Sequence, residues 1–205
     1  MKLVVQADLT LDGVMQSPGL PEEDRSGGFD HGGWLVPYAD DVFQEMRGDS
    51  IRAADGLLLG RKTYEIFAGY WPRITDPDNE IATMLNTMPK HVASRTLDTV
   101  EWNNSRLIKG DVAEAVGELK SQPGRELQVY GSIDLAQTLM RHDLVDEYRL
   151  SFAPLVLGTG KRLFLEGAVP AAMRLTDTKK TSTGLVSHTY ERAGKPEYGS
   201  FALEE

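Results

Sequence analysis

Three short segments of the sequence place glycine, hydroxyl or cationic residues directly after a predicted strand, where such residues could bind a ligand. The first is Gly60-Arg61-Lys62-Thr63-Tyr64-Glu65, which directly follows the apolar stretch 57–59. A glycine lets the backbone approach a ligand closely, and a helix that starts here would offer free N–H groups and the positive end of its dipole. Arg61 and Lys62 add positive charge, and the Thr63 hydroxyl can donate a hydrogen bond. The segment predicts an anion site, with a capped helix and two solvated cations as the alternative.

The other two segments also follow predicted strands. Ser94-Arg95 comes after 90–93, and a hydroxyl beside a guanidinium suits a phosphate monoester, although the pair is also common in turns. Tyr130-Gly131-Ser132-Ile133-Asp134 comes after 127–129, where Gly131 permits an unusual backbone conformation and Ser132 is a good N-cap. An N-cap without any ligand is the alternative reading. None of the three is a dinucleotide-binding G-x-G-x-x-G or a Walker A loop.

The elements that must position these segments alternate along the chain. Apolar runs predict strands and apolar residues at helical spacing predict helices. The last three segments alternate as half-buried strands do, with Thr183-Gly184 as a turn between the final two. This order predicts an α/β domain with a mixed, mostly parallel sheet that ends in an antiparallel hairpin. The expected strands are 3–7, 56–60, 90–94, 107–108, 127–130, 145–152, 173–181 and 185–192, and the expected helices are 37–53, 63–69, 81–88, 112–121 and 133–141.

Two further segments are predicted to be irregular. The stretch 17–33 is rich in glycine and proline, and a loop of this length in a compact domain is typical of an active-site flap. We expect one domain over residues 1–193, followed by a loose tail over 194–205. In an open α/β sheet, ligands bind outside the carboxyl ends of the strands, which is where all three of these segments are expected.

Composition excludes several classes of function. The 205 residues include no cysteine, so a disulfide scaffold, a thiolate zinc site, an iron–sulfur cluster and a cysteine nucleophile are excluded. The net charge of −9 argues against nucleic acid as a partner. The four histidines are scattered, and we expect no metal site. No apolar run approaches the length of a transmembrane helix and the first residues do not resemble a signal peptide, so we expect a cytoplasmic protein without membrane contact.

Taken together, the segments resemble the dihydrofolate reductase superfamily, and within it the reductase domain of the bifunctional riboflavin-biosynthesis deaminase–reductases. The resemblance spans about residues 2–192. It implies a single three-layer α/β/α domain that binds NADPH and transfers a hydride. The pieces that carry it are Leu9–Gly13, Leu59–Glu65, Val92–Arg95, Tyr130–Leu135, Leu144–Tyr148 and Pro154–Gly160.

The resemblance also assigns residues to the cofactor. One group would meet the phosphates, a second the adenosine 2′-phosphate, a third the pyrophosphate, and a fourth the nicotinamide. In that order the groups are Gly60, Arg61, Lys62 and Thr63; Ser94 and Arg95; Gly131, Ser132, Ile133 and Asp134; and Ala7, Gly13, Val14 and Met15. Tyr130 is also assigned to the cofactor. The chain departs from the family in two ways, because Gly131-Ser132 stands where members often carry Gly-Gly, and because we expect these 205 residues to be the reductase module alone, without the deaminase domain.

Reduction of an imine or carbonyl also requires a proton donor. Dihydrofolate reductases use a buried carboxylate on the helix after the flap, and Asp40 and Asp41 fall in roughly that place. The alternative is that both acids only charge the start of the helix. Asp12, beside Gly13, is another candidate, with a turn-forming Asp-Gly pair as its alternative. Aromatic side chains that could wall a flat substrate, or instead belong to the core, are Trp34, Phe67 and Trp71.

Two functions from different classes follow from the resemblance. The first is an NADPH-dependent reductase of a small heterocycle that resembles either a pterin or a riboflavin precursor. The pieces Asp12-Gly13, Asp146-Glu147 and Pro154–Gly160 favour 5-amino-6-(5-phosphoribosylamino)uracil reductase over dihydrofolate reductase. That phosphorylated substrate would require a second anion site, which the sequence does not reveal. The second function is an NADPH-binding sensor or partner-binding module without turnover. The resemblance also implies a homodimer, and the C-terminal strands offer a face for it.

Overall fold

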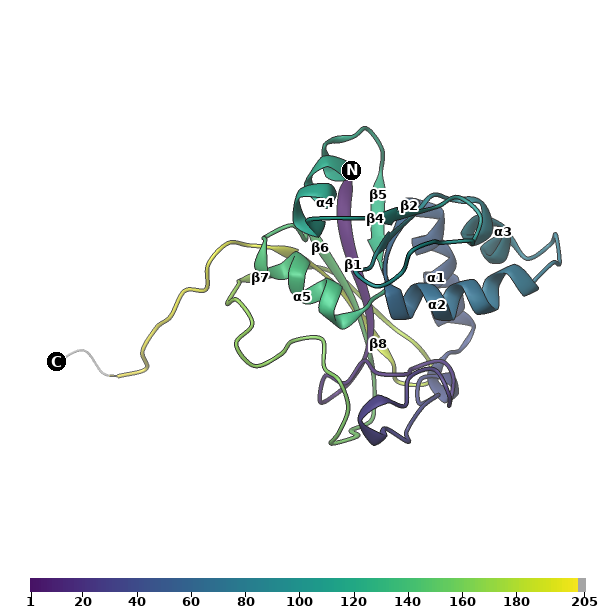
Figure 1. Cartoon of the computed structure of the whole chain (residues 1–205). Helices are drawn as coiled ribbons and strands as arrows, with labels where there is room; N and C mark the ends of the chain where they lie inside the picture. Colours follow the sequence, from purple (N-terminus) through teal and green to yellow (C-terminus); the bar gives the residue numbers. More distant parts are fainter. Residues whose placement is uncertain (203–205) are drawn as a thin grey trace.

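The computed structural model describes residues 1–202, which build one eight-stranded sheet in the order β4-β3-β2-β5-β1-β6-β8-β7 (Figure 1). The strands are β1 Lys2–Thr10, β2 Ala54–Gly60, β3 Lys90–Ala93, β4 Ser105–Ile108, β5 Glu126–Val129, β6 Glu147–Ala153, β7 Met173–Lys180 and β8 Val186–Arg192. The helices are α1 Asp41–Ala53, α2 Arg61–Tyr70, α3 Glu80–Thr87, α4 Val112–Ser121 and α5 Ile133–Arg141.

The sheet is parallel from β4 to β6, and β8 then pairs antiparallel with both β6 and β7. The prediction of a mostly parallel sheet ending in an antiparallel hairpin is therefore confirmed. β5 lies between β2 and β1 although it follows both in the chain. This crossover sets the carboxyl ends of β1, β2 and β5 side by side, which is where ligands bind in such sheets.

Helices cover both faces of the sheet, which confirms the three-layer arrangement. On one face, α4 and α5 pack on β1 and β5 through residues such as Val116, Leu139 and Val129, none of which is exposed. On the other face, α2 and α3 pack on β2 and β3 around Leu57, Leu59 and Leu85. Strands buried on both sides are apolar throughout, which explains the uninterrupted leucines at 57–59.

The irregular loop over 17–33 packs closely against the body of the protein. Phe29 of this loop and Trp34, which directly follows it, form a small third buried cluster with Val14. The Trp34 Nε1–H donates to the Gln16 carbonyl (2.8 Å), and the Gln16 amide donates to two loop carbonyls. Apart from a short 3-10 turn at 26–28, it contains no helix or strand. Trp34 is thus part of the core; whether the loop closes over a ligand stays a prediction.

The expected helix 37–53 starts later, at Asp41. The side chain of Asp40 accepts a hydrogen bond from the Phe43 N–H (3.0 Å), which makes Asp40 the N-cap. The segment before it, Val36–Tyr38, forms a separate 3-10 turn. β1 runs three residues further than expected because its ladder with β6 continues to the pair Thr10–Ala153.

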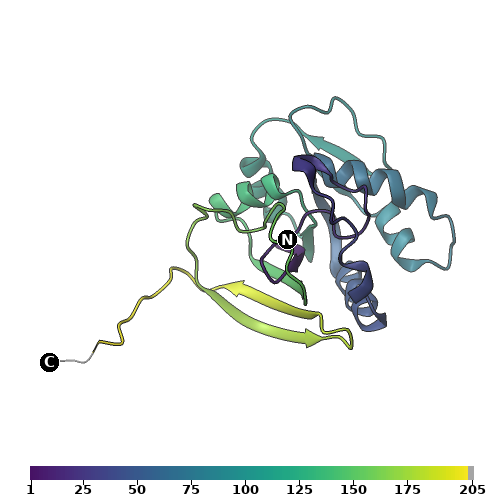
Figure 2. The same ribbon diagram turned by 90° about the horizontal axis from the view of Figure 1, so that it is seen from below.

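The β7–β8 hairpin forms one edge of the sheet, and Figure 2 shows that the residues after β8 lead outward from it. Residues 195–202 contain no helix or strand. Residues 203–205 of the predicted tail lie outside the described part of the chain. No helix within 1–202 is long and apolar enough to cross a membrane.

Candidate functional site

The starts of α2 and α5 touch each other at the carboxyl edge of the sheet. The Gly60 N–H donates to the Gly131 carbonyl (3.0 Å). A Cβ on Gly60 would lie 2.8 Å from the Ser132 backbone nitrogen, and a Cβ on Gly131 would lie 2.8 Å from Thr63 Oγ1. Gly131 also has a φ of +126°, and the peptide bond between it and Ser132 is cis. The close approach of the two helix starts therefore requires glycine at both positions.

These two helix starts lack the side-chain caps found on the other three α-helices. Asp40, Asn79 and Asp111 accept backbone N–H bonds at the starts of α1, α3 and α4. Gly60 has no side chain, and the Ser132 hydroxyl makes no cap bond although Ser132 holds the predicted N-cap position. The first N–H groups of α2 and α5 thus remain available, and both helix dipoles present their positive ends at one point. An anion such as a pyrophosphate fits this arrangement.

The turn after β3 lies against the start of α2. The Arg61 guanidinium donates to Thr96 Oγ1 (2.6 Å) and to Glu65 Oε1 (2.6 Å). The Ser94 hydroxyl oxygen accepts the N–H groups of Thr96 and Leu97 (3.2 and 3.0 Å), so its own O–H can still donate. Arg95 is exposed beside it. The structure thus brings three predicted phosphate contacts, Arg61, Ser94 and Arg95, to one edge.

The predicted nicotinamide residues lie at the end of β1 and in the tight turn that follows it. Ala7 is buried in β1, and Gly13 turns the chain with a φ of +80°. Val14 is fully buried, and the Met15 N–H donates to the Lys161 carbonyl (2.9 Å). Backbone hydrogen bonds hold the Gly13–Met15 turn against residues 161–163.

Asp12 ties this turn to the 154–162 segment. Its carboxylate accepts hydrogen bonds from the Thr10 hydroxyl (2.6 Å) and from the N–H groups of Leu157 and Gly158 (3.2 and 2.9 Å). The Thr10 bond, together with these backbone bonds, lowers the pKa of Asp12 to about 2. An acid with this pKa is ionised at neutral pH. The contacts of Asp12 therefore favour a structural role, in which it holds the turn against the 154–162 segment. The catalytic role of Asp12 stays a prediction.

The Asp12 carboxylate also gives a pH prediction. Because its pKa is lower in the folded protein than in the unfolded chain, its contribution to stability is present above pH 4 and is lost as the pH falls through about 2. We expect Asp12→Asn to make the unfolding free energy, measured by urea titration, less dependent on pH in that window. An unchanged pH dependence would contradict the stabilising role.

The contacts of Asp40 and the exposure of Asp41 bear on their predicted role as proton donors. Besides capping α1, Asp40 accepts the N–H and the hydroxyl of Ser182 (2.9 and 2.7 Å), and the Ser182 hydroxyl is the main cause of its lowered pKa. Asp40 thereby pins the start of α1 to the β7–β8 turn. Asp41 is exposed in the first turn of α1. Neither carboxylate is buried, and their catalytic roles stay predictions.

A buried acid that the sequence analysis missed is Asp8, the residue after Ala7. Its side chain is 13% exposed and pairs with Arg47 of α1. Burial raises the pKa of Asp8, against the opposing effect of the Arg47 charge. Arg47 also donates to Gln6 Oε1 (3.3 Å) and lies over the Phe43 ring (4.9 Å). The signal that could have identified Asp8 is a charged residue inside a buried strand. The expected first strand instead ended at Ala7, directly before Asp8.

Two more groups complete the surroundings of Asp8. The Tyr130 hydroxyl accepts the Gln6 amide (2.9 Å) and donates to Gln128 Oε1 (3.0 Å), and burial raises the pKa of Tyr130 to about 12. Glu23 of the 17–33 loop accepts the Gly19 and Leu20 N–H groups. Burial raises the pKa of Glu23, and the nearby Asp8 charge contributes to the rise. The loop thus brings a second carboxylate toward Asp8.

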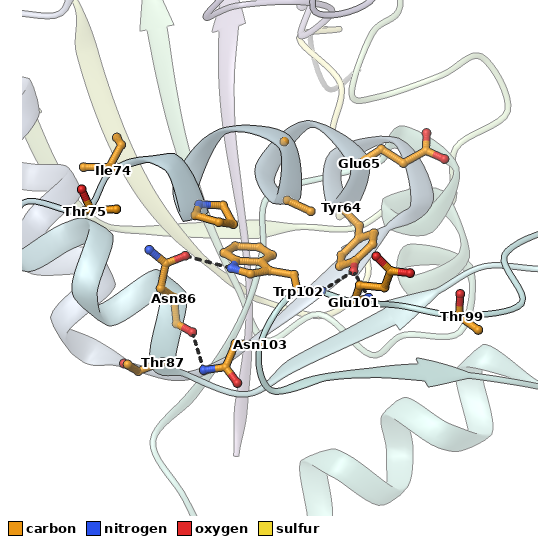
Figure 3. Close-up of a pocket in the computed structure, with 13 residues that line it drawn as sticks. Tyr64, Glu65, Ile74, Thr75, Asn86, Thr87, Thr99, Glu101, Trp102 and Asn103 are labelled. Carbon is orange, nitrogen blue, oxygen red and sulfur yellow. Dashed lines mark hydrogen bonds between the residues drawn. The ribbon is translucent and has the colours of Figure 1, made fainter.

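Two hollows in the described part of the chain, residues 1–202, lie apart from the expected cofactor edge. The larger, about 890 Å³, lies between α2, the end of α3 and the 99–103 segment, as shown in Figure 3. Its wall is fixed by the Tyr64 hydroxyl, which accepts the Glu101 and Trp102 N–H groups (2.9 and 3.0 Å), and by Asn86, which accepts the Trp102 indole N–H. No predicted site residue lines it. The smaller hollow, about 340 Å³, lies between α1 and the strands β6, β8 and β7.

The family of the chain is decided by comparison with known proteins. Residues 1–187 match the model of the RibD C-terminal domain. The chain belongs to the RibD C-terminal domain family. This confirms the resemblance to riboflavin-biosynthesis reductases, and the match supports an oxidoreductase of the riboflavin or folate type.

Within residues 1–202, no group of three or more histidine, aspartate or glutamate side chains could hold a metal ion.

Individual relatives agree with this assignment. The uncharacterized protein YyaP of Bacillus subtilis is 31% identical over 195 residues, which cover 94% of this chain and 96% of YyaP. A putative riboflavin biosynthesis protein from Shewanella sp. PV-4 has a similar structure (TM-score 0.68, 23% identity, 94% and 99% of the two chains). Dihydrofolate reductase from Enterococcus faecalis, in complex with NADP(H), is more distant (TM-score 0.57, 15% identity, 93% and 96%). At these identities the two solved structures show the fold, and they confirm the dihydrofolate reductase-like class.

Proposed function

We propose that this RibD C-terminal domain protein binds NADPH and catalyses hydride transfer to a small heterocycle that resembles a riboflavin precursor or a pterin. The observation that carries the proposal is the contact between the two uncapped helix starts at Gly60 and Gly131. A phosphate group bound there would receive backbone N–H bonds from both helices. Family membership supports the same assignment.

The residues present fit NADPH at its three parts. The pyrophosphate would lie against the N–H groups of 61–63 and 133–134. The 2′-phosphate would lie between Arg61, Lys62, Ser94 and Arg95, which favours NADPH over NADH. The nicotinamide would lie against Ala7 and the Gly13–Met15 turn, with Tyr130 beside it. NADPH supplies the hydride when bound, and the chain orients both reactants and excludes water.

Hydride transfer to the carbon of a C=N or C=O bond also requires a proton at the nitrogen or oxygen atom, and we propose Asp8 as the group that holds this proton. Asp8 follows the nicotinamide residue Ala7 and has a raised pKa because it is buried. Arg47 fixes the orientation of its carboxyl group. Asp12 and Asp40 have lowered pKa values, so both are ionised at neutral pH and carry no proton to donate.

Turnover is measured most simply as the loss of NADPH absorbance at 340 nm. We expect oxidation of NADPH with 5-amino-6-(5-phosphoribosylamino)uracil, its dephosphorylated analogue or a dihydropterin as acceptor. The competing function is an NADPH-binding sensor without turnover. Tight NADPH binding together with no oxidation across this panel would support the sensor and contradict the reductase. A chain without cysteine that uses NADPH suits the cytoplasm.

We further propose that the protein forms a homodimer through β7 and the face of β6–β8–β7 opposite α1. β7 is an edge strand, and Leu175 on this face is 51% exposed. Leu175 pairs with Tyr190, which in turn pairs with Tyr148, so the three side chains share the face. Phe164 packs beside Tyr148 and is 46% exposed. A second copy would cover this apolar surface and the open edge.

The proposed dimer interface can be tested with a substitution of Leu175. Leu175→Glu would place a charge in the covered face, and we expect the dimer to dissociate at least tenfold more readily in sedimentation equilibrium. Lys179→Glu alters the opposite face of the same strand and is the matched control. A wild-type protein that sediments as a monomer at micromolar concentration would contradict the proposal.

A further inference from the structure

The larger hollow is separate from the proposed cofactor and proton-donor sites. It lies between the second half of α2, the end of α3 and the segment 99–103, and none of the residues assigned to NADPH lines it (Figure 3). Its volume of about 890 Å³ is in the range of pockets that bind small molecules. The groups on its walls determine which ligand chemistry it favours.

The amide and indole donors on these walls are already bonded within the protein. The Asn86 amide donates to the Trp71 carbonyl (3.0 Å), and the Asn103 amide donates to the Asn86 carbonyl (3.3 Å). The Trp102 indole N–H donates to Asn86 Oδ1 (2.9 Å). Within residues 1–202, no group donates to Asn103 Oδ1 or to the Glu101 carboxylate, and both residues line the hollow. The walls therefore favour a ligand that donates hydrogen bonds.

Glu101 also gives the hollow an uncompensated negative charge. It is exposed and forms no ion pair in the part of the chain that the structure describes. The other carboxylate on the walls belongs to Glu65, which pairs with Arg61 (2.6 Å). Among residues 1–202, no lysine, arginine or histidine lines the hollow. The charge of Glu101 is thus available to a cation from outside the chain.

Two cations, Lys90 and Arg73, lie close to the hollow without lining it. Lys90 is fully buried against the Trp102 ring (4.2 Å), and its ammonium group donates to backbone carbonyls. Arg73 lies between the lining residues Pro72 and Ile74 in the chain and is exposed, so water and salt screen its charge. Neither cation forms an ion pair with Glu101 in the described part of the chain.

The end of α2 adds to the negative potential and supplies an apolar wall. Ala68 and Gly69, in the last turn of α2, line the hollow. The helices α1, α4 and α5 each carry a basic residue in their last turn, whereas α2 carries none. The negative end of the α2 dipole therefore lacks a counter-charge from its own last turn. Ala68, Pro72 and Ile74 give the apolar part of the lining.

We propose that this hollow binds a small organic cation, whose ammonium or guanidinium group pairs with Glu101 and whose apolar body packs on Ala68, Pro72 and Ile74. Such a group donates the hydrogen bonds that the free acceptors require. An anion would instead meet Glu101 with no lining cation to compensate it. Because the site is separate from the cofactor edge, the proposal does not depend on the proposed reductase function.

Phenethylamine and 2-phenylethanol test the charge preference, because they share an apolar body and differ in the ammonium group. Each is titrated at low ionic strength into the whole protein with 15N-labelled tryptophan, and the indole signals are followed by NMR. The Trp102 signal, identified with Trp102→Phe, reports on the wall of the hollow. We expect phenethylamine to shift this signal with a Kd at least fivefold lower than that of 2-phenylethanol. High salt should reduce the difference.

Glu101→Gln removes the unpaired carboxylate and keeps the shape of the side chain. We expect the variant to bind the two compounds with Kd values within about twofold of each other, because the ion pair is lost. The matched control is Glu118→Gln, which removes an exposed carboxylate from α4 on the other face of the sheet. Glu118→Gln should keep the wild-type preference, although it changes the net charge by the same amount.

A second variant places a competing cation at the hollow. A Cβ on Gly69 would meet no atom within 4 Å, so a longer side chain fits there without a clash. We expect Gly69→Lys to weaken phenethylamine binding at least fivefold, and Gly69→Gln, which adds length without charge, to weaken it less. If Glu101→Gln does not fold, the ligand pair and the two Gly69 variants still test the proposal.

Several results would overturn the proposal. These are equal binding of the two compounds, binding that leaves the Trp102 signal unchanged, and an equal loss of preference in Glu101→Gln and Glu118→Gln. If the Trp102 signal shifts with protein concentration and with neither compound, another copy of the chain covers the hollow and the cation site is wrong. A preference that persists when NADPH fails to bind would leave the cation site standing and contradict only the cofactor assignment.

Discussion

Gly60→Ala is expected to abolish measurable NADPH binding, with a loss in affinity of at least a hundredfold. The added Cβ would lie 2.2 Å from the Ser132 hydroxyl oxygen and 2.8 Å from the Ser132 backbone nitrogen. A flexible side chain can move away, but the backbone at the start of α5 cannot move without separating the two helix starts. Both sets of N–H groups would then no longer reach the same pyrophosphate. Since Gly60 has an ordinary φ of −73°, the effect arises from this contact and not from backbone strain.

The matched control is Gly69→Ala in the same helix. A Cβ on Gly69 would meet no atom within 4 Å, and alanine in a helix is slightly more favourable than glycine. We expect Gly69→Ala to bind NADPH as the wild type does and to be equally or more stable to urea. If Gly60→Ala binds NADPH normally while remaining folded, the junction of α2 and α5 is not the pyrophosphate site.

Asp8→Asn is expected to lower kcat by about 10²–10³-fold and to leave the NADPH dissociation constant within a factor of about three, because general acid catalysis contributes on this scale. The amide keeps the shape of the side chain but cannot donate the proton. In the wild type, kcat should fall as the pH rises through the raised pKa of Asp8, because the donor then loses its proton. The variant should lack this decrease.

Comparison with the other acids makes this result specific. We expect Asp12→Asn and Asp40→Asn to change protein stability more than the pH dependence of kcat, because their carboxylates hold loop and helix contacts. A pH profile that is the same in Asp8→Asn and the wild type would exclude Asp8 as the proton donor. If Asp40→Asn instead loses the pH dependence of kcat, Asp40 at the start of α1 is the proton donor.

The junction of α2 and α5, where we propose that the cofactor binds, could be predicted from sequence because each of its segments is local. A buried strand, a glycine and a helix start follow one another within a few residues at Gly60 and again at Gly131, and parallel strands bring such ends together. What the sequence could not show is that the Ser132 hydroxyl makes no cap bond. That depends on the contact with Gly60, which is 72 positions earlier in the chain.

The buried polar groups were harder to predict because their partners are distant in sequence. Asp8 finds Arg47 on another element, and the pairing has no local pattern. Lys90 was expected only as the first residue of a strand, yet it is fully buried. Its ammonium group donates to the carbonyls of Met88 and Asn103 (2.8 Å each) and lies 4.2 Å from the centre of the Trp102 ring. Such sites depend on tertiary packing, which composition and periodicity do not encode.

The most direct test of the central claim is a titration of the purified protein with NADPH and with NADH, followed by quenching of tryptophan fluorescence. Trp34, Trp71 and Trp102 provide the signal. The account predicts that NADPH binds at least tenfold more tightly than NADH and that Arg95→Ala reduces this preference, because the 2′-phosphate loses a cation. Equal binding of the two cofactors would contradict the 2′-phosphate assignment, and binding of neither would contradict the proposed function.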